Sequence, residues 1–213
     1  MATPTSNGNC FICGKTAGKI AIKNHVLKEH NDGDDLCYLI KAEGAYRKDF
    51  WLLFTVPLDA TLADIDTFLR VIWCECCGHR SAFKRKGNEF AKSRRMSVFS
   101  VGDTLHYEYD FGSTTEILIT FVHEILRPYQ EEVVCLLARN EQPEEKCDEC
   151  GGLATVVDVC EQKYLCDNCA EKVGEDVLLP LVNSPRAGEC DYRGELDIWT
   201  FSPDGPFPQP GYD

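Results

Sequence analysis

The sequence predicts an α+β protein with a largely antiparallel sheet and one main helix, to which small zinc-binding segments are attached. Residues 61–73 carry apolar side chains at three- and four-residue steps, which is the spacing of one buried helix face. Segments with strand character lie before and after this helix, an order that is typical of α+β folds. Short cysteine pairs in both halves of the chain indicate the metal-binding segments.

The strands are predicted from composition and alternation. Residues 37–42 form a first strand, and 50–58 form an apolar, aromatic strand that closes at Pro57. The helix begins at Thr61, because Asp64 three residues later completes a capping box. After the helix, 104–109 alternates large apolar and polar side chains, and 115–125 and 133–138 are two further strands.

Charge and composition limit the kinds of partner. The net charge is -13, and residues 1–110 hold 15 Lys/Arg against 14 Asp/Glu, whereas 111–213 hold 7 against 21. An acidic half repels phosphate backbones, so the net charge does not favour nucleic acid. The start of the chain lacks the pattern of a secretory signal and no apolar run is long enough for a bilayer, so we expect a cytoplasmic protein without a membrane partner.

A basic stretch is the local exception to the acidic balance. Seven Lys or Arg residues lie between His79 and Arg95, with Glu89 as the only acid. We interpret this run as a solvated face of a strand and turn, because charge runs usually are. The alternative is a small site for an anionic partner.

Cysteine pairs at zinc-ribbon spacing form the strongest motif. Cys147 and Cys150 form one pair and Cys166 and Cys169 form another, with fifteen residues between the two pairs. A two-residue gap lets both thiolates of a turn reach one ion, and two such turns complete a tetrahedral shell. Disulfides are rare in a reducing cytosol, which makes metal binding the better explanation for the thirteen cysteines. Cys160, between the pairs, is a spare thiol or a substitute ligand.

The second motif resembles a zinc finger. Eleven residues lie between the pair Cys10 and Cys13 and the next ligand candidate, His25. His30 follows His25 by five residues on an expected helix, a separation that zinc fingers accept. The alternative is a tail in which these residues are incidental. With the four-cysteine motif, this predicts two zinc ions. A finger of this kind can read DNA, but one finger with two lysines neutralises little phosphate, so structural or protein-contact use is favoured.

A third group of thiols follows the predicted helix. Cys74, Cys76, Cys77 and His79 lie within six residues. They could ligate a further ion, or Cys77 and His79 could form a thiol–imidazole pair. Adjacent ligands crowd each other and the local sequence offers no fourth partner. We therefore expect buried cysteines and a histidine that caps the helix end.

These features divide the chain into parts. Residues 1–35 form an N-terminal Cys/His segment that begins with a flexible tail over 1–9. Residues 36–140 and 177–201 form the α+β core, which 177–182 rejoins because they are apolar. Residues 141–176 are a four-cysteine insertion, and 202–213 are a tail rich in proline and glycine.

Several motifs together resemble a known family. They are Phe50, Thr61-Leu62-Ala63-Asp64, Trp73, Cys77-Gly78-His79, Phe83, Tyr107-Glu108-Tyr109-Asp110-Phe111-Gly112 and the closing stretch from Asn183 to Gly194. In this order they resemble the plasmid pRiA4b ORF-3-like family, also labelled a transposon passenger TnpR-like group, in a zinc-containing branch. The resemblance covers roughly 36–140 and 177–195 and implies an α+β fold. It implies no biochemical activity.

Motif position suggests one polar pocket. Asp110 lies in a turn that its side chain can stabilise by accepting backbone hydrogen bonds, and Arg186 lies in a loop rich in proline and glycine. The structural interpretation is a hairpin turn and an ordinary loop. The functional alternative is a pocket formed by His79, Asp110 and Arg186.

The sequence favours a non-enzymatic, zinc-stabilised module that binds another protein. The acidic C-terminal half favours a partner with a basic surface. The first alternative is a nucleic-acid-associated accessory protein that uses the N-terminal finger and the basic stretch. The second is a metal-dependent hydrolase, which needs a zinc ion with an open coordination position.

Overall fold

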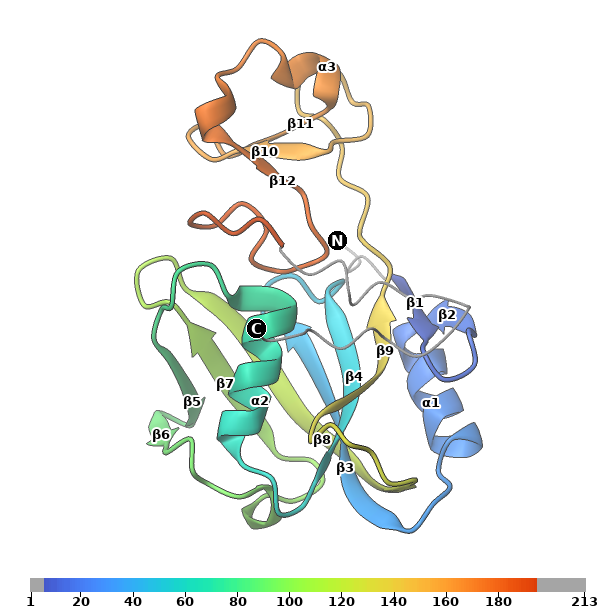
Figure 1. The fold of residues 1–213 in the computed structure, drawn as a ribbon. Helices are drawn as coiled ribbons and strands as arrows, with labels where there is room; N and C mark the ends of the chain where they lie inside the picture. Colours follow the sequence, from blue (N-terminus) through green and yellow to red (C-terminus); the bar gives the residue numbers. More distant parts are fainter. Residues whose placement is uncertain (1–5, 195–213) are drawn as a thin grey trace.

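A computed structural model describes residues 6–194, and it confirms the α+β fold with a largely antiparallel sheet and one main helix (Figure 1). The main sheet has nine strands in the order β2-β1-β9-β4-β3-β8-β7-β5-β6, and a separate sheet has three in the order β11-β10-β12. Every strand pair in both sheets is antiparallel.

The predicted strands are present, some of them longer than expected. The main sheet contains β1 (Asn7–Cys10), β2 (Thr16–Gly18), β3 (Asp35–Gly44), β4 (Trp51–Pro57), β5 (Ser81–Arg85), β6 (Asn88–Phe90), β7 (Thr104–Tyr109), β8 (Thr115–Arg127) and β9 (Cys135–Asn140). The short sheet contains β10 (Val156–Asp158), β11 (Lys163–Leu165) and β12 (Leu178–Pro180). The helices are α1 (Lys19–Glu29), α2 (Leu62–Leu69) and α3 (Asp167–Ala170). Strands β5 and β6 correspond to the basic stretch interpreted as a face of a strand and turn, whereas β1, β2 and the strands of the short sheet were not predicted.

The centre of the main sheet is buried on both faces. In β4, Leu52, Phe54 and Val56 pack with α2 in one core cluster. The side chains of Trp51 and Leu53 point the other way and pack with Ile22 and Val26 of α1. Because a strand alternates its side chains between faces, a helix on each face requires the continuous apolar run seen in this strand.

Helix α2 starts as the sequence predicts and ends irregularly. Asp64 accepts hydrogen bonds from the backbone amide and the hydroxyl of Thr61, at 2.7 and 2.8 Å. After Leu69 the chain continues as one π-helical turn, Arg70–Cys74. Single π turns inside helices occur frequently at functional sites. This turn delivers the Cys76–His79 stretch to the end of the sheet that lies nearer to the short sheet (Figure 1).

A buried carboxylate fixes α2 against the sheet. Asp66 accepts hydrogen bonds from Tyr107 of β7 and Ser81 of β5, at 2.8 and 2.6 Å. It also pairs with Arg70 at 3.1 Å and with Lys92 at 2.7 Å. Burial opposes the charge on Asp66, but these donors hold its pKa below the ordinary value. The helix end therefore has a defined position relative to β5 and β7.

The N-terminal segment differs from the expected tail. Residues 7–10 are strand β1, which pairs with β9 of the main sheet. Gly8 permits this pairing, since a Cβ on it would lie 2.4 Å from the Trp51 ring and 2.3 Å from the carbonyl oxygen of Arg139. The Cys/His segment thus forms one edge of the main sheet. The first five residues and the predicted tail over 202–213 lie outside the described residues.

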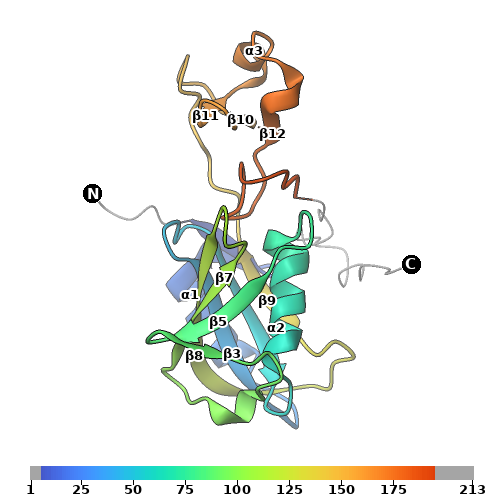
Figure 2. The ribbon, with the colours of Figure 1, turned by 90° about the vertical axis from the view of Figure 1, so that its left-hand side faces the viewer.

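The four-cysteine segment forms a short body beyond one end of the main sheet (Figures 1 and 2). Residues 177–182, expected in the main core, instead contribute β12, which pairs with β10. The apolar side chains of this strand are needed there, because the only buried hydrophobic residues in that cluster are Cys147, Leu165 and Ala170 among the described residues. We call residues 146–182 the cysteine unit.

Residues 183–194, called the closing segment below, lie between the cysteine unit and the main body (Figure 1). Asn183 exchanges hydrogen bonds with Asn140 at 2.6 and 2.8 Å, and Ser184 donates one to the carbonyl of Trp73 at 2.7 Å. On the other side, a Cβ on Gly188 would lie 2.9 Å from a methyl group of Val157. The segment therefore contacts both bodies.

Candidate metal centres

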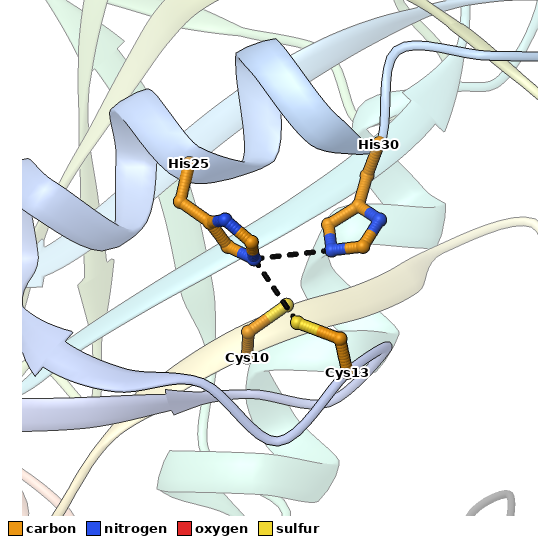
Figure 3. Close-up of side chains that lie close together, drawn as sticks. All are labelled: Cys10, Cys13, His25 and His30. Carbon is orange, nitrogen blue, oxygen red and sulfur yellow. Dashed lines mark hydrogen bonds between the residues drawn. The ribbon is translucent and has the colours of Figure 1, made fainter.

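The predicted finger ligands converge at the edge of the main sheet. Cys10 ends β1, Cys13 lies in the following turn, His25 lies on α1 and His30 follows its end (Figure 3). The four ligand atoms lie within 4.8 Å of one another and can hold a metal ion. Cys13 Sγ lies 3.0 Å from His25 Nε2, which lies 3.2 Å from His30 Nε2.

Burial makes this group part of the main core. Cys10 is fully buried and packs with Ile22, Val26 and Trp51. Burial raises the pKa of the Cys10 thiol, and burial also lowers the pKa of both His25 and His30. Neutral imidazole is the form that binds metals, so the environment of the two histidines suits ligation.

The four predicted cysteines of the cysteine unit also converge. The sulfur atoms of Cys147, Cys150, Cys166 and Cys169 lie within 4.8 Å of one another and can hold a second ion. Cys150 and Cys166 are 3.6 Å apart. Backbone hydrogen bonds, first that of Cys166 and then those of Cys150 and Glu149, lower the pKa of Cys147 to about 6. The hydrogen bond with the Cys166 thiol raises the pKa of Cys169 to about 12. Cys160 is exposed and belongs to no group of metal-binding residues among those described.

Both groups use the same turn after the first cysteine pair. The amide of Gly14 donates to the carbonyl of Cys10, and that of Gly151 donates to Cys147, each at 2.8 Å. These glycines have φ of 75° and 74°. Residues with side chains rarely adopt such values, so the turn requires glycine at both positions. The shared geometry turns both sulfur atoms of each pair to the same side.

A third group was only partly foreseen. Cys74 is fully buried, as expected, and its pKa is raised by burial. Cys76, Cys77 and His79, however, meet Cys190 of the closing segment, and the four ligand atoms lie within 4.8 Å of one another. The fourth partner absent from the local sequence comes from a segment 111 residues further along the chain than His79. Cys190 was missed because only the fold brings it there.

The suggested polar residues also lie together, as a chain of contacts. Arg186 is fully buried and donates a hydrogen bond to Asp110 Oδ2 at 2.8 Å. It also donates to the hydroxyl of Thr115 and to the carbonyl of Ser113, each at 3.0 Å. Asp110 Oδ1 lies 3.5 Å from His79 Nδ1. Burial opposes the charge of Asp110, but the Arg186 hydrogen bond keeps its pKa below the ordinary value. The three residues predicted from motif position thus contact one another, and a pocket for a ligand stays a prediction.

The basic stretch is partly neutralised. Lys84 pairs with Glu108 at 2.6 Å, Arg85 with Asp103 at 2.7 Å, and Lys92 with Asp66. The face is built from β5 and β6 and the loop after them. Such pairing is what the interpretation as a solvated face leads one to expect.

Comparisons with known proteins add little to this picture. No protein-family model matches the chain, and no curated protein matches it. Among solved structures, the chain is similar to a protein of unknown function from Methanosarcina mazei Go1. The identity is 16%, with a TM-score of 0.40 over 55% of this chain and 75% of that chain. A likeness this distant carries no argument about function, and the resemblance to the pRiA4b ORF-3-like family stays a prediction.

Membrane insertion through helices has no support in the described residues. Over residues 6–194, every helix is too short or too polar to cross a bilayer.

The buried Arg186–Asp110 pair gives a first prediction. We expect Arg186→Met to lower the free energy of unfolding by about 3–5 kcal/mol, because it leaves the Asp110 carboxylate buried without its partner. Adding Asp110→Asn should recover part of this loss. The measurement is urea denaturation of the two single variants and the double variant. Additive losses in the double variant would contradict direct coupling of the pair.

Proposed function

We propose that this chain is a non-enzymatic protein in which zinc ions hold two structural clasps, and that it acts as an interaction or adaptor module. The observation that carries the proposal is the convergence of four protein ligands in each of two separate groups. The first clasp is Cys10, Cys13, His25 and His30; the second is Cys147, Cys150, Cys166 and Cys169.

The distances support zinc as the metal. Zn–S bonds of 2.3 Å and Zn–N bonds near 2.0 Å place tetrahedral sulfur ligands about 3.8 Å apart and nitrogen ligands about 3.3 Å apart. The Cys150–Cys166 sulfur separation is 3.6 Å, and the His25–His30 nitrogen separation is 3.2 Å. Sets of four thiolates, or of two thiolates with two imidazoles, are typical zinc ligands.

The ligand count supports a structural role for both ions. A catalytic zinc ion keeps one position for water or substrate, whereas four protein ligands fill a tetrahedral shell. In each clasp the four protein atoms lie close enough together to fill it. This argues against the hydrolase alternative at these two sites.

The two clasps hold different parts of the chain. At the first, an ion joins the β1 turn to α1, which packs its residues Ile22 and Val26 on the sheet. At the second, an ion takes the place of a core, because the cysteine unit buries few apolar side chains. Zinc-binding free energy in such small units is folding free energy.

Surface charge favours a basic protein as the partner. The cysteine unit exposes Asp148, Glu149, Glu161, Asp167, Glu171, Glu175 and Asp176. Its exposed basic side chains are Lys146 and Lys172. An acidic surface on a projecting body attracts basic surfaces and repels phosphate.

The nucleic-acid alternative has weaker support. Helix α1, which would enter a groove, packs one face against the main sheet and pairs its Lys28 with Glu29 at 2.6 Å. Three of the seven positive side chains in the basic stretch form ion pairs with acidic residues of this chain. Four exposed positive side chains remain there, Arg80, Lys86, Arg94 and Arg95, which is a small number for phosphate neutralisation.

Metal content tests the clasps directly. We expect Cys166→Ser and His25→Ala each to lose one equivalent of zinc, because each removes a ligand from a different four-ligand shell. The measurement is the zinc-to-protein ratio by elemental analysis of protein purified without added metal.

Two matched variants control for side effects of substitution. Cys160→Ser removes an exposed thiol of the same unit, and His123→Ala removes an exposed imidazole of the main sheet; both should keep the full zinc content. A folded wild-type protein free of metal would overturn the proposal.

Salt-dependent binding separates the two kinds of partner. We expect no retention on duplex DNA or single-stranded RNA at low ionic strength, since the acidic surface repels phosphate. A basic probe protein such as lysozyme should be retained at low salt and released as the salt concentration rises. The reverse pattern, with binding to nucleic acid that weakens steeply with salt, would favour the accessory-protein alternative.

A further inference from the structure

The third thiol group connects two segments that are remote in the sequence. Cys76, Cys77 and His79 follow the π turn at the end of α2, and Cys190 comes from the closing segment. All four ligand atoms lie within 4.8 Å of one another. We propose that these residues bind a third zinc ion, which fastens the closing segment to the end of α2. This inference does not depend on either of the two clasps.

Three of the four ligand-atom separations are close to those of a tetrahedral zinc shell, and the Cys77–His79 separation is shorter. Cys77 Sγ lies 3.6 Å from Cys76 Sγ and 3.5 Å from Cys190 Sγ. His79 Nε2 lies 3.4 Å from Cys190 Sγ and 2.9 Å from Cys77 Sγ. Zinc with three thiolates and one imidazole requires about 3.8 Å between sulfur atoms and about 3.5 Å between sulfur and nitrogen. Three thiols and an imidazole form one of the common structural zinc sets.

The backbone bends so that adjacent cysteines can both face the ion. Gly78 has a φ of 76°, and its amide donates to the Glu75 carboxylate at 2.6 Å. Cys190 has a φ of 54°, which is uncommon for a residue with a side chain. Backbone outliers of this kind persist where surrounding structure holds them and are concentrated at functional sites. At Cys190 the conformation turns the thiol toward Cys77 and His79.

Asp110 and Arg186 form an outer shell for the same ion. The Asp110 carboxylate lies 3.5 Å from Nδ1 of His79, on the ring nitrogen opposite the one that faces the sulfur atoms. Metal-binding histidines generally donate their other N–H to a carboxylate or carbonyl, which fixes the ring orientation. Arg186 holds Asp110 and also donates a hydrogen bond to Cys76 Sγ at 3.5 Å. The polar chain thus orients ligands of the third site.

The third ion would fix the position of the cysteine unit. The closing segment contacts Trp73 and Asn140 of the main body and reaches Val157 of the cysteine unit at Gly188. Cys190 follows this contact by two residues. An ion that holds Cys190 to the helix end therefore limits movement of the segment between the two bodies.

Zinc counting on a matched pair of variants tests the proposal. We expect three zinc ions per wild-type chain and two for Cys190→Ser and for Cys77→Ser, which remove exposed thiols. Cys160→Ser, also an exposed thiol, should keep three. Asp110→Asn should keep the third ion but bind it about 10–100-fold more weakly in competition with a chelator.

Cobalt substitution identifies which site is lost. Thiolate-to-cobalt absorption grows with the number of Co–S bonds, and three of the nine thiolates in the groups belong to this site. Cys190→Ser should therefore lower this absorption by about a third while circular dichroism stays unchanged.

The outcomes separate this proposal from the two clasps. A wild-type protein with two zinc ions that are lost in Cys166→Ser and His25→Ala would keep the clasps and overturn the third site. A Cys77–Cys190 disulfide in protein purified under reducing conditions would also overturn it, as would three ions in Cys190→Ser.

Discussion

The most demanding feature of this fold is how closely it brings thiol groups together. Nine of the thirteen cysteines fall into three groups whose ligand atoms lie within 4.8 Å of one another. Thiolates at such distances repel each other. A bound divalent cation converts the repulsion into attraction and becomes the largest local charge. We propose that metal ions, rather than added apolar surface, hold the cysteine unit and the closing segment in place.

The three groups occupy the boundaries of the architecture. The first lies where β1, next to the edge strand β2, meets α1. The second lies inside the cysteine unit, and the third lies where the closing segment reaches the end of α2. The sheet between them has its own large core on both faces. The chain therefore combines a hydrophobic body with a cysteine unit that buries little apolar surface, for which metal ligands are a common solution.

Much of this was readable from the sequence because the signals are local. The capping box at Thr61, the alternation over 104–109 and the three CxxC pairs of the two predicted zinc sites all depend on neighbouring residues. Non-local features were missed: β12 pairs with β10 instead of joining the main core, and Cys190 joins a group more than a hundred residues away. The basic stretch was interpreted only as a face of a strand and turn, because charged side chains of β5 that face acids obscure the alternation with apolar ones. Spacing cannot reveal such partners, which are chosen by the tertiary fold.

Hydrogen exchange before and after zinc removal tests whether the cysteine unit needs zinc to fold. A strong chelator is expected to abolish amide protection across the cysteine unit, while β3 and β8 at the centre of the main sheet keep their protection. Protection should return when one zinc equivalent per site is restored. Equal protection of the cysteine unit with and without zinc would contradict the account, because its fold would then be stable without the ion.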